Sequence, residues 1–204
     1  MKTRMISVML LTLVWAALSS TFEDSLIAEM NLVRENPSRY AERFIVPLLN
    51  RSTESISIYP SGLRVRSKEG LSLIIECMSY LDTVSSTHHL SSSRGLALGA
   101  RDHALDQSVS GQTGHRGGDG SYSETRVNRY GRWRGATSED ISYGLSSPRD
   151  IIISLLIDDG FESRGHRLDV LSSEHYKMGA YSTTHPRIRN MCVITLAVRY
   201  EERY

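Results

Sequence analysis

Two histidines and three acidic residues stand in loops beside the ends of predicted helices: His115, Glu139, the neighbours Asp158 and Asp159, and His166. Imidazole nitrogens and carboxylate oxygens suit zinc and similar divalent cations. The same groups can also move protons as general acids and bases. Metal binding and acid–base chemistry are therefore the two chemical hypotheses for these residues.

The spacing of these residues matches no compact motif. The sequence has no HExxH, CxxC or EF-hand pattern, so spacing alone gives little support for a metal. It also has no GxSxG turn and no GxxxxGK phosphate loop, so neither an α/β-hydrolase nor a P-loop enzyme is supported. The purely structural alternatives stay open: Glu139 could complete a hydrogen-bond network, and Asp159 could cap a helix.

Helical periodicity predicts the elements that hold these residues. Helices are expected over residues 25–36, with Ser25 as the N-cap, around 40–45, over 71–81, over 95–109 and over 147–157. A glycine-rich loop over 111–121 carries His115. Asp158 and Asp159 follow the last helix directly, where the sequence Asp-Asp-Gly ends it.

Apolar runs predict the strands. Residues 56–58 and 63–65 flank a Pro-Ser-Gly turn and predict a small hairpin. Residues 178–182 and 191–200 also predict strands, and the second is apolar on both faces, as in a central strand. The chain shows no repeats and no linker. We expect one α+β domain over residues 21–204, with helices packed on a small, mainly antiparallel sheet.

Charge and the N-terminus limit the cellular setting. The 204 residues carry a formal net charge of +1, which argues against a nucleic-acid partner. Lys2 and Arg4 precede an apolar run and then small residues, which predicts a signal peptide over residues 1–20. The run is shorter than the roughly 20 residues of a membrane span, although an uncleaved anchor is the alternative. We expect a secreted, extracellular protein with no integral membrane span.

The chain has two cysteines, Cys77 in a helical pattern and Cys192 in a strand pattern. A disulfide between them would need their Cα atoms within about 7 Å. Buried free thiols are the alternative, and the sequence leaves both open.

Several segments follow one another in an order typical of a known family. They are 31–37 (NLVRENP), 114–121 (GHRGGDGS), 126–131 (RVNRYG), 139–144 (EDISYG), 163–167 (SRGHR) and 191–194 (MCVI). Together they resemble the CAP superfamily, or SCP domain, of cysteine-rich secretory, venom-antigen and pathogenesis-related proteins. The match is best to the branch found in bacteria and protists, and it covers nearly all of residues 24–200.

The resemblance implies a three-layer α-β-α sandwich with a central cleft, where two histidines and two acids can hold a divalent cation, often zinc. By position, His115, Glu139 and His166 match three of these residues. The second acid falls on Asp158 or Asp159, and Asp159 is preferred. Either aspartate is one methylene shorter than the glutamate that the family has there.

This sequence also departs from the family pattern. Ser138 and Asp140 stand where the Gly-Glu-Asn-Ile signature has Gly and Asn. If Asp140 shared the cleft with Glu139, the two carboxyl groups would raise each other's pKa or strengthen cation binding. The cysteine-rich tail of venom-type members is absent, so the channel-directed functions of that tail are not expected.

The expected function is a secreted, non-enzymatic module that binds a ligand or an extracellular protein partner. Sterols or fatty acids are the small ligands that the resemblance implies, and zinc or another divalent cation is the expected cofactor of the cleft. The alternative is a zinc-dependent hydrolase or protease, with Glu139 or Asp159 as general base and the histidines as ligands.

Overall fold

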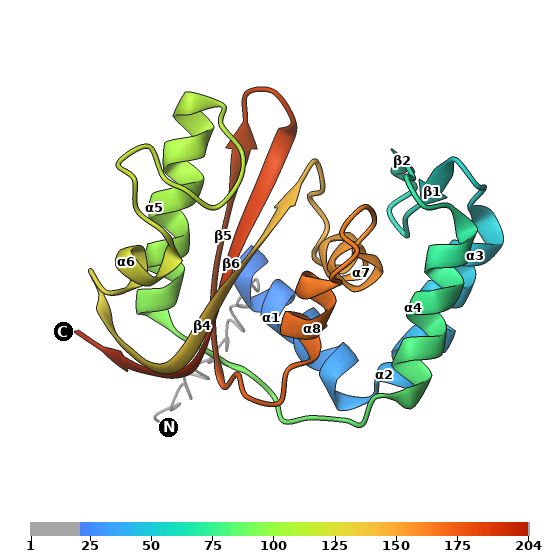
Figure 1. Cartoon of the computed structure of the whole chain (residues 1–204), viewed down its shortest axis with the longest axis horizontal. Helices are drawn as coiled ribbons and strands as arrows, with labels where there is room; N and C mark the ends of the chain where they lie inside the picture. Colours follow the sequence, from blue (N-terminus) through green and yellow to red (C-terminus); the bar gives the residue numbers. More distant parts are fainter. Residues whose placement is uncertain (1–20, 204) are drawn as a thin grey trace, which may run out of the picture.

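The computed structural model describes residues 21–203, so the predicted signal peptide lies outside the described residues. The described chain is a three-layer α-β-α sandwich with a further helical layer on one side (Figure 1). The expected fold class is therefore confirmed. Within residues 21–203, no helix is both long enough and apolar enough to cross a membrane.

The middle layer is a four-stranded sheet in the order β3-β5-β6-β4. Its strands are β3 (Ser91–Ser92), β4 (Gly131–Tyr143), β5 (Lys177–His185) and β6 (Arg189–Glu202). Only β3 pairs in parallel, with β5; the other pairs are antiparallel. Strand β6 lies between β5 and β4, which confirms the central strand predicted from its two apolar faces. Strand β4 is an edge strand.

One face of the sheet is covered by α5 (Arg94–Ser110) and α6 (Ser123–Val127). Helix α5 lies against β5 so closely that Gly179 has no room for a side chain, because a Cβ there would collide with the backbone of Ala97. A smaller core fills this side, with Ala100, Ala104 and Val193 fully buried.

The other face carries the main hydrophobic core and is covered by α1 (Phe22–Glu35), α7 (Pro148–Ile157) and α8 (Gly165–Leu171). Helix α1 begins with a capping box between Thr21 and Asp24, so the N-cap is Thr21 and not the expected Ser25. Helix α7 is buried around most of its circumference, as its continuous apolar run predicts.

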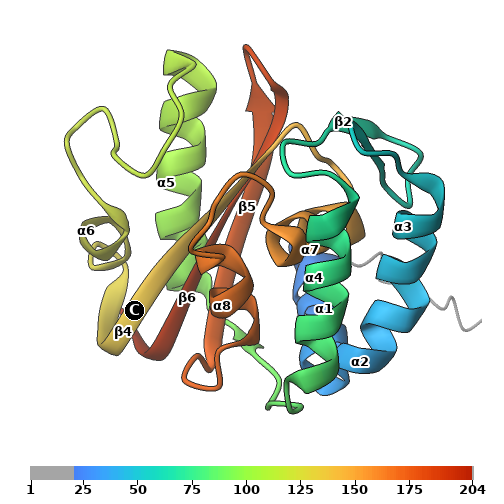
Figure 2. The ribbon, with the colours of Figure 1, turned by 45° about the vertical axis from the view of Figure 1, so that its right-hand side comes forward.

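The additional outer layer packs outside α1 and α7 (Figure 2). It consists of α2 (Pro37–Tyr40), a π-helical turn η1 (Ala41–Ile45), α3 (Val46–Arg51), β1 (Ile56–Ile58), β2 (Arg64–Arg66) and α4 (Leu71–Thr83). Strands β1 and β2 form the predicted antiparallel hairpin, and α4 is the predicted helix, extended by two residues.

Both cysteines are free and buried, so of the two open alternatives the structure has the buried thiols. Burial raises the pKa of the Cys77 thiol to about 12. Burial also raises the pKa of Cys192. Both side chains serve as small apolar residues of the main core.

Candidate functional site

Strand β4 divides the candidate site into two sides. Side chains alternate along a strand, so Glu139 and Asp140 point to opposite faces of the sheet. Glu139 lies on the face covered by α5 and α6, where it meets Arg126 of α6. Asp140 is paired in register with Ile194, a residue of the main core, and so faces α7 and α8.

On the first side, Glu139 binds both a histidine and an arginine. Its Oε1 lies 3.0 Å from His115 Nδ1, and its Oε2 accepts a hydrogen bond of 2.6 Å from Arg126. Only 3% of the Glu139 side chain is exposed, whereas 50% of the His115 side chain is. Arg126 also donates to the His115 and Ser121 carbonyl oxygens, which fixes the glycine-rich loop against the sheet.

These partners keep Glu139 ionised. Burial by itself would raise the pKa of this carboxyl group. The hydrogen bond from His115 and the nearby Arg126 guanidinium outweigh burial and hold the pKa below its usual value. The carboxylate therefore has a fixed negative charge and both of its oxygens are engaged.

A cavity of about 160 Å³ adjoins Arg126 on the same side. Its lining includes Asp102, His103, Asp106, Asp119 and Arg129. Most of the lining groups are bound to one another: Arg129, for example, donates to both Asp102 and Asp119. His103 is fully buried and bonds the Gly114 carbonyl through Nε2, so it is a structural histidine.

On the second side, His166 is bound to Asp158. Helix α7 ends at Ile157, and the left-handed backbone of its C-cap Asp158 (φ 56°) turns the chain and directs the Asp158 carboxylate at α8. One oxygen lies 2.6 Å from His166 Nδ1, and the other accepts the His166 backbone N–H at 3.0 Å. Phe161 stands edge-on to the imidazole, with 5.2 Å between ring centroids.

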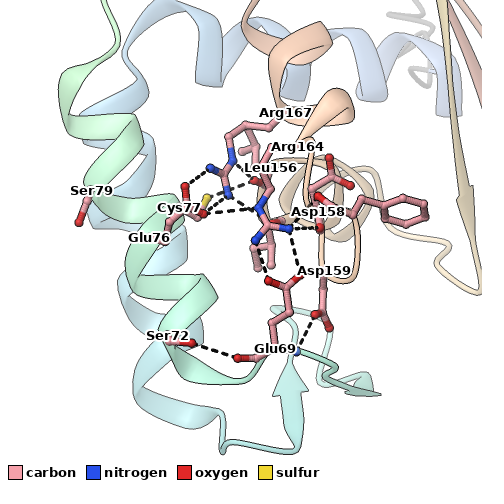
Figure 3. Close-up of polar contacts among 12 residues, drawn as sticks. Glu69, Ser72, Glu76, Cys77, Ser79, Leu156, Asp158, Asp159, Arg164 and Arg167 are labelled. Atoms are coloured by element: carbon pink, nitrogen blue, oxygen red, sulfur yellow. Dashed lines mark hydrogen bonds and ion pairs between the residues drawn. The ribbon is translucent and has the colours of Figure 1, made fainter.

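The Asp159 carboxylate points away from that of Asp158 (Figure 3). Its carboxylate accepts the backbone N–H groups of Lys68 and Glu69, at 2.8 and 3.0 Å, just before α4. Asp158, and not the preferred Asp159, is therefore the acid in contact with His166. The physical reason is the left-handed residue at position 158, after which the chain turns toward the outer layer.

The outer layer holds the loop that carries Asp158. Glu69 accepts two hydrogen bonds from Arg164 (Figure 3). One of its oxygens also accepts the Gly160 N–H. Arg167 of α8 makes a bidentate ion pair with Glu76 of α4. Sequence reasoning missed Glu69, Glu76 and Arg126. The partners of Glu69 and Glu76 lie 91 to 95 positions away in the sequence. Arg126 meets Glu139 only because α6 packs on the sheet face that Glu139 occupies.

Within residues 21–203, the Asp140 side chain has no hydrogen-bond partner. It is completely buried, and neither carboxyl oxygen makes a hydrogen bond to another described residue. Burial raises its pKa well above the ordinary value, and the negative charges of Asp169, Asp158 and Glu139 act in the same direction. Asp140 faces away from Glu139, so the two do not share one open cleft.

The structure thus brings the predicted residues together as two pairs, His115 with Glu139 and His166 with Asp158, one on each side of β4. No group of three or more His, Cys, Asp or Glu side chains in residues 21–203 is arranged to hold a metal ion. The carboxylates fit the role of groups that orient a histidine ligand, because each engages an imidazole Nδ1. Within residues 21–203, the donor set therefore does not form the expected four-residue cation site.

The α-β-α sandwich with two histidine–carboxylate pairs beside one edge strand corresponds to a known family of domains. Residues 85–197 match the family described as "CAP: Cysteine-rich secretory protein family". The match spans more than half of the chain, so the chain belongs to the CAP family.

Two solved structures are also similar to it. An outer surface protein from Borrelia burgdorferi has 17% sequence identity and a TM-score of 0.47, over 65% of this chain and 89% of that chain. An "extracellular protein containing a SCP domain from Bacillus anthracis str. Ames" has 16% identity and a TM-score of 0.44, over 62% of this chain and 37% of that chain. No curated protein matches the sequence.

Proposed function

We propose that this chain is an extracellular, non-enzymatic binding protein, in which His115 and His166 contact the ligand from the two sides of β4. The observation that carries the proposal is the state of the two imidazoles. Each has its Nδ1 engaged by a buried carboxylate, and neither Nε2 makes a hydrogen bond to another residue in 21–203. Fixed side chains with one free polar atom are suited to binding, because little mobility is lost when a ligand arrives.

A divalent cation, zinc first, is the proposed cofactor of this site. Histidines that bind metals usually give their other ring N–H to a carboxylate, as both of these histidines can. Each imidazole would offer its Nε2 to a cation, whose other positions would be left to solvent or to the ligand. Such a site loses its cation easily, so we expect binding to depend on added zinc.

The proposed ligands are a sterol or a fatty acid, with an extracellular protein partner as the alternative. Family membership supports the lipid ligands, and the half-exposed ring of Phe161 beside His166 offers them an apolar contact. The signal-peptide pattern of residues 1–20 and the family support an extracellular location.

A zinc-dependent hydrolase is the second candidate, because a carboxylate beside an imidazole also suits proton transfer. The two proposed general bases argue against it. Glu139 is held by Arg126 and His115, and Asp159 is held by two backbone N–H groups. Neither carboxylate is free to take a proton from water.

The test measures equilibrium binding of a labelled sterol and a labelled fatty acid to residues 21–204, each with and without zinc. We expect saturable binding that zinc strengthens, and we expect His115→Ala and His166→Ala to abolish the zinc effect. His89→Ala is the matched control, because its imidazole is 59% exposed and belongs to neither pair. Absence of saturable binding for both probes would remove the lipid proposal, and a zinc effect that survives in both variants would remove the role of the histidines.

A further inference from the structure

The β1–β2 hairpin of the outer layer lies outside the residues of the family match and presents one face to solvent. It stands at one end of α3 and α4, at the periphery of the molecule (Figure 1). Ser57 of β1 is buried, and Val65, its partner in β2, packs against the main core. Because side chains alternate along a strand, Arg64 and Arg66 of β2 point the other way, and both are exposed.

Strand β2 is an edge strand with open backbone groups. The backbone N–H of Tyr59 bonds the carbonyl oxygen of Leu63 where the hairpin turns. Antiparallel bonds join every second residue pair, so Arg64 and Arg66 direct their N–H and C=O groups away from β1. No hydrogen bond from another residue in 21–203 reaches these four groups, and β2 pairs with no strand other than β1 in that range.

Positive charge is concentrated around this edge. Residues 51–68 contain four basic side chains and one acidic side chain, in a chain whose formal net charge is +1. The acidic residue, Glu54, accepts the backbone N–H of Leu71. The guanidinium groups of Arg64 and Arg66 make no hydrogen bond or ion pair to any other residue in 21–203. Two cations on one face of the strand are therefore open to a partner of opposite charge.

The hairpin is fixed at both ends of β2. Ser61, in the turn before β2, donates its hydroxyl to the carboxylate of Asp150 in α7. Lys68, just after β2, donates its backbone N–H to Asp159 at 2.8 Å. Because β2 is tied to α7 and to the loop that follows α7, little backbone freedom is lost when a further strand is added.

We propose that β2 binds an extended acidic segment of a partner protein by strand addition. The backbone of the segment pairs with the N–H and C=O groups of Arg64 and Arg66, and its carboxylates, two residues apart, pair with the two guanidinium groups. Charge disfavours a second copy of this chain as the occupant, because two β2 strands side by side would bring arginine against arginine. The inference goes beyond the proposed function and does not depend on His115 or His166.

The test measures binding of a short fluorescent peptide to residues 21–204 by anisotropy, and amide resonances locate the peptide on the protein. The peptide has glutamate at alternate positions, with valine and threonine between them. We expect saturable binding that shifts the amide signals of Arg64 and Arg66. A peptide with lysine in place of each glutamate should bind at least about tenfold more weakly, the scale of a hydrogen bond to a charged group.

A second peptide separates strand addition from attraction between charges. It keeps every glutamate but carries a methyl group on the backbone nitrogen of each one. In an antiparallel pair, the residues opposite Arg64 and Arg66 donate their N–H groups to β2, and the methylated peptide cannot do so. We expect this peptide to bind about fivefold more weakly or worse.

Variants of the protein test the two arginines. Arg64→Gln and Arg66→Gln should each weaken binding of the acidic peptide about fivefold or more, and the double variant further. Arg101→Gln removes an exposed arginine of α5, on the other side of the central sheet, and should change nothing. His115→Ala and His166→Ala should bind the peptide as the unmodified protein does, so a failure of the site at β4 is distinguishable from a failure here. Circular dichroism and thermal unfolding check that each variant is folded.

Three results would overturn the proposal. One is that the acidic peptide shows no saturable binding. Another is that the methylated peptide binds as tightly as the unmethylated one, which would indicate a surface that attracts polyanions of any kind. The third is that the folded double variant of Arg64 and Arg66 binds the acidic peptide as tightly as the unmodified protein.

Discussion

Glu139 and Asp140 are neighbours in β4, yet their carboxyl groups lie on opposite faces of the sheet. Glu139 meets Arg126 and His115, which satisfy its charge. The Asp140 carboxyl group is buried on the other face of the sheet, near α8, and makes no hydrogen bond to any described residue. One step along the strand therefore separates a satisfied buried charge from an unsatisfied buried carboxyl group. The pKa of the first is lowered and that of the second is raised.

The first prediction concerns the ion pair of Glu139. Glu139→Gln leaves the buried Arg126 guanidinium without its counter-charge, which should lower the free energy of unfolding by about 3–5 kcal/mol. Because the folded pKa of Glu139 is lowered, its stabilising contribution is present above the unfolded-state pKa and is lost as pH falls through the folded pKa. Urea unfolding over a range of pH measures both effects.

The control is Glu201→Gln, which removes an exposed ion pair with Arg134. Exposed pairs contribute about 1 kcal/mol or less. If Glu139→Gln lowers the free energy of unfolding no more than Glu201→Gln does, the Glu139–Arg126 ion pair does not stabilise the site.

The second prediction concerns Asp140. Asp140→Asn should increase the free energy of unfolding at neutral pH by about 1–3 kcal/mol, because it removes the ionisable group from a buried site that offers it no partner. The folded pKa is raised, so the unmodified protein loses stability as pH rises above the ordinary aspartate value of 3.8 and until the folded pKa is passed. The difference in free energy of unfolding between Asp140→Asn and the unmodified protein should therefore shrink as the pH is lowered toward 3.8. An asparagine variant that unfolds at a lower urea concentration at neutral pH would contradict this prediction.

The third prediction concerns the contact between the outer layer and the loop of Asp158. Glu69→Gln weakens the ion pair with Arg164 and the hydrogen bond from Gly160. Global stability should change by about 1 kcal/mol or less, because the pair is partly exposed. Amide hydrogen exchange over residues 158–166 should nevertheless become faster, because the loop loses part of its attachment.

Glu201→Gln again serves as the comparison, since it removes an exposed pair at the far end of β4. Equal exchange rates over residues 158–166 in the two variants would show that Glu69 does not position the His166–Asp158 pair.

The sequence predicted the elements whose apolar pattern faces a core. Helices α4, α5 and α7 and strand β6 each bury a regular set of apolar side chains, and each was predicted within a few residues. Strand β4 was missed because its first half, from Gly131 to Thr137, shows no apolar alternation. It forms because β6 pairs with it on both sides of an irregularity between Arg134 and Thr137, which is a tertiary effect and not a local one.

The same distinction applies to the site. The residue types and the family resemblance indicated His115, Glu139 and His166, and the structure pairs the first two directly. The sequence alone could not show which of the two neighbouring aspartates, Asp158 or Asp159, contacts His166. The contact depends on one left-handed residue and on backbone N–H groups 90 and 91 positions away in the sequence.

The most direct test of the central claim is a zinc titration of residues 21–204 at neutral pH, followed by the imidazole resonances of the histidines. We predict that zinc shifts the signals of both His115 and His166 until they reach saturation, while the signal of His89 does not move. Signals of His115 and His166 that do not respond to zinc, or that move no more than the signal of His89, would contradict a role for these two imidazoles in binding the cation.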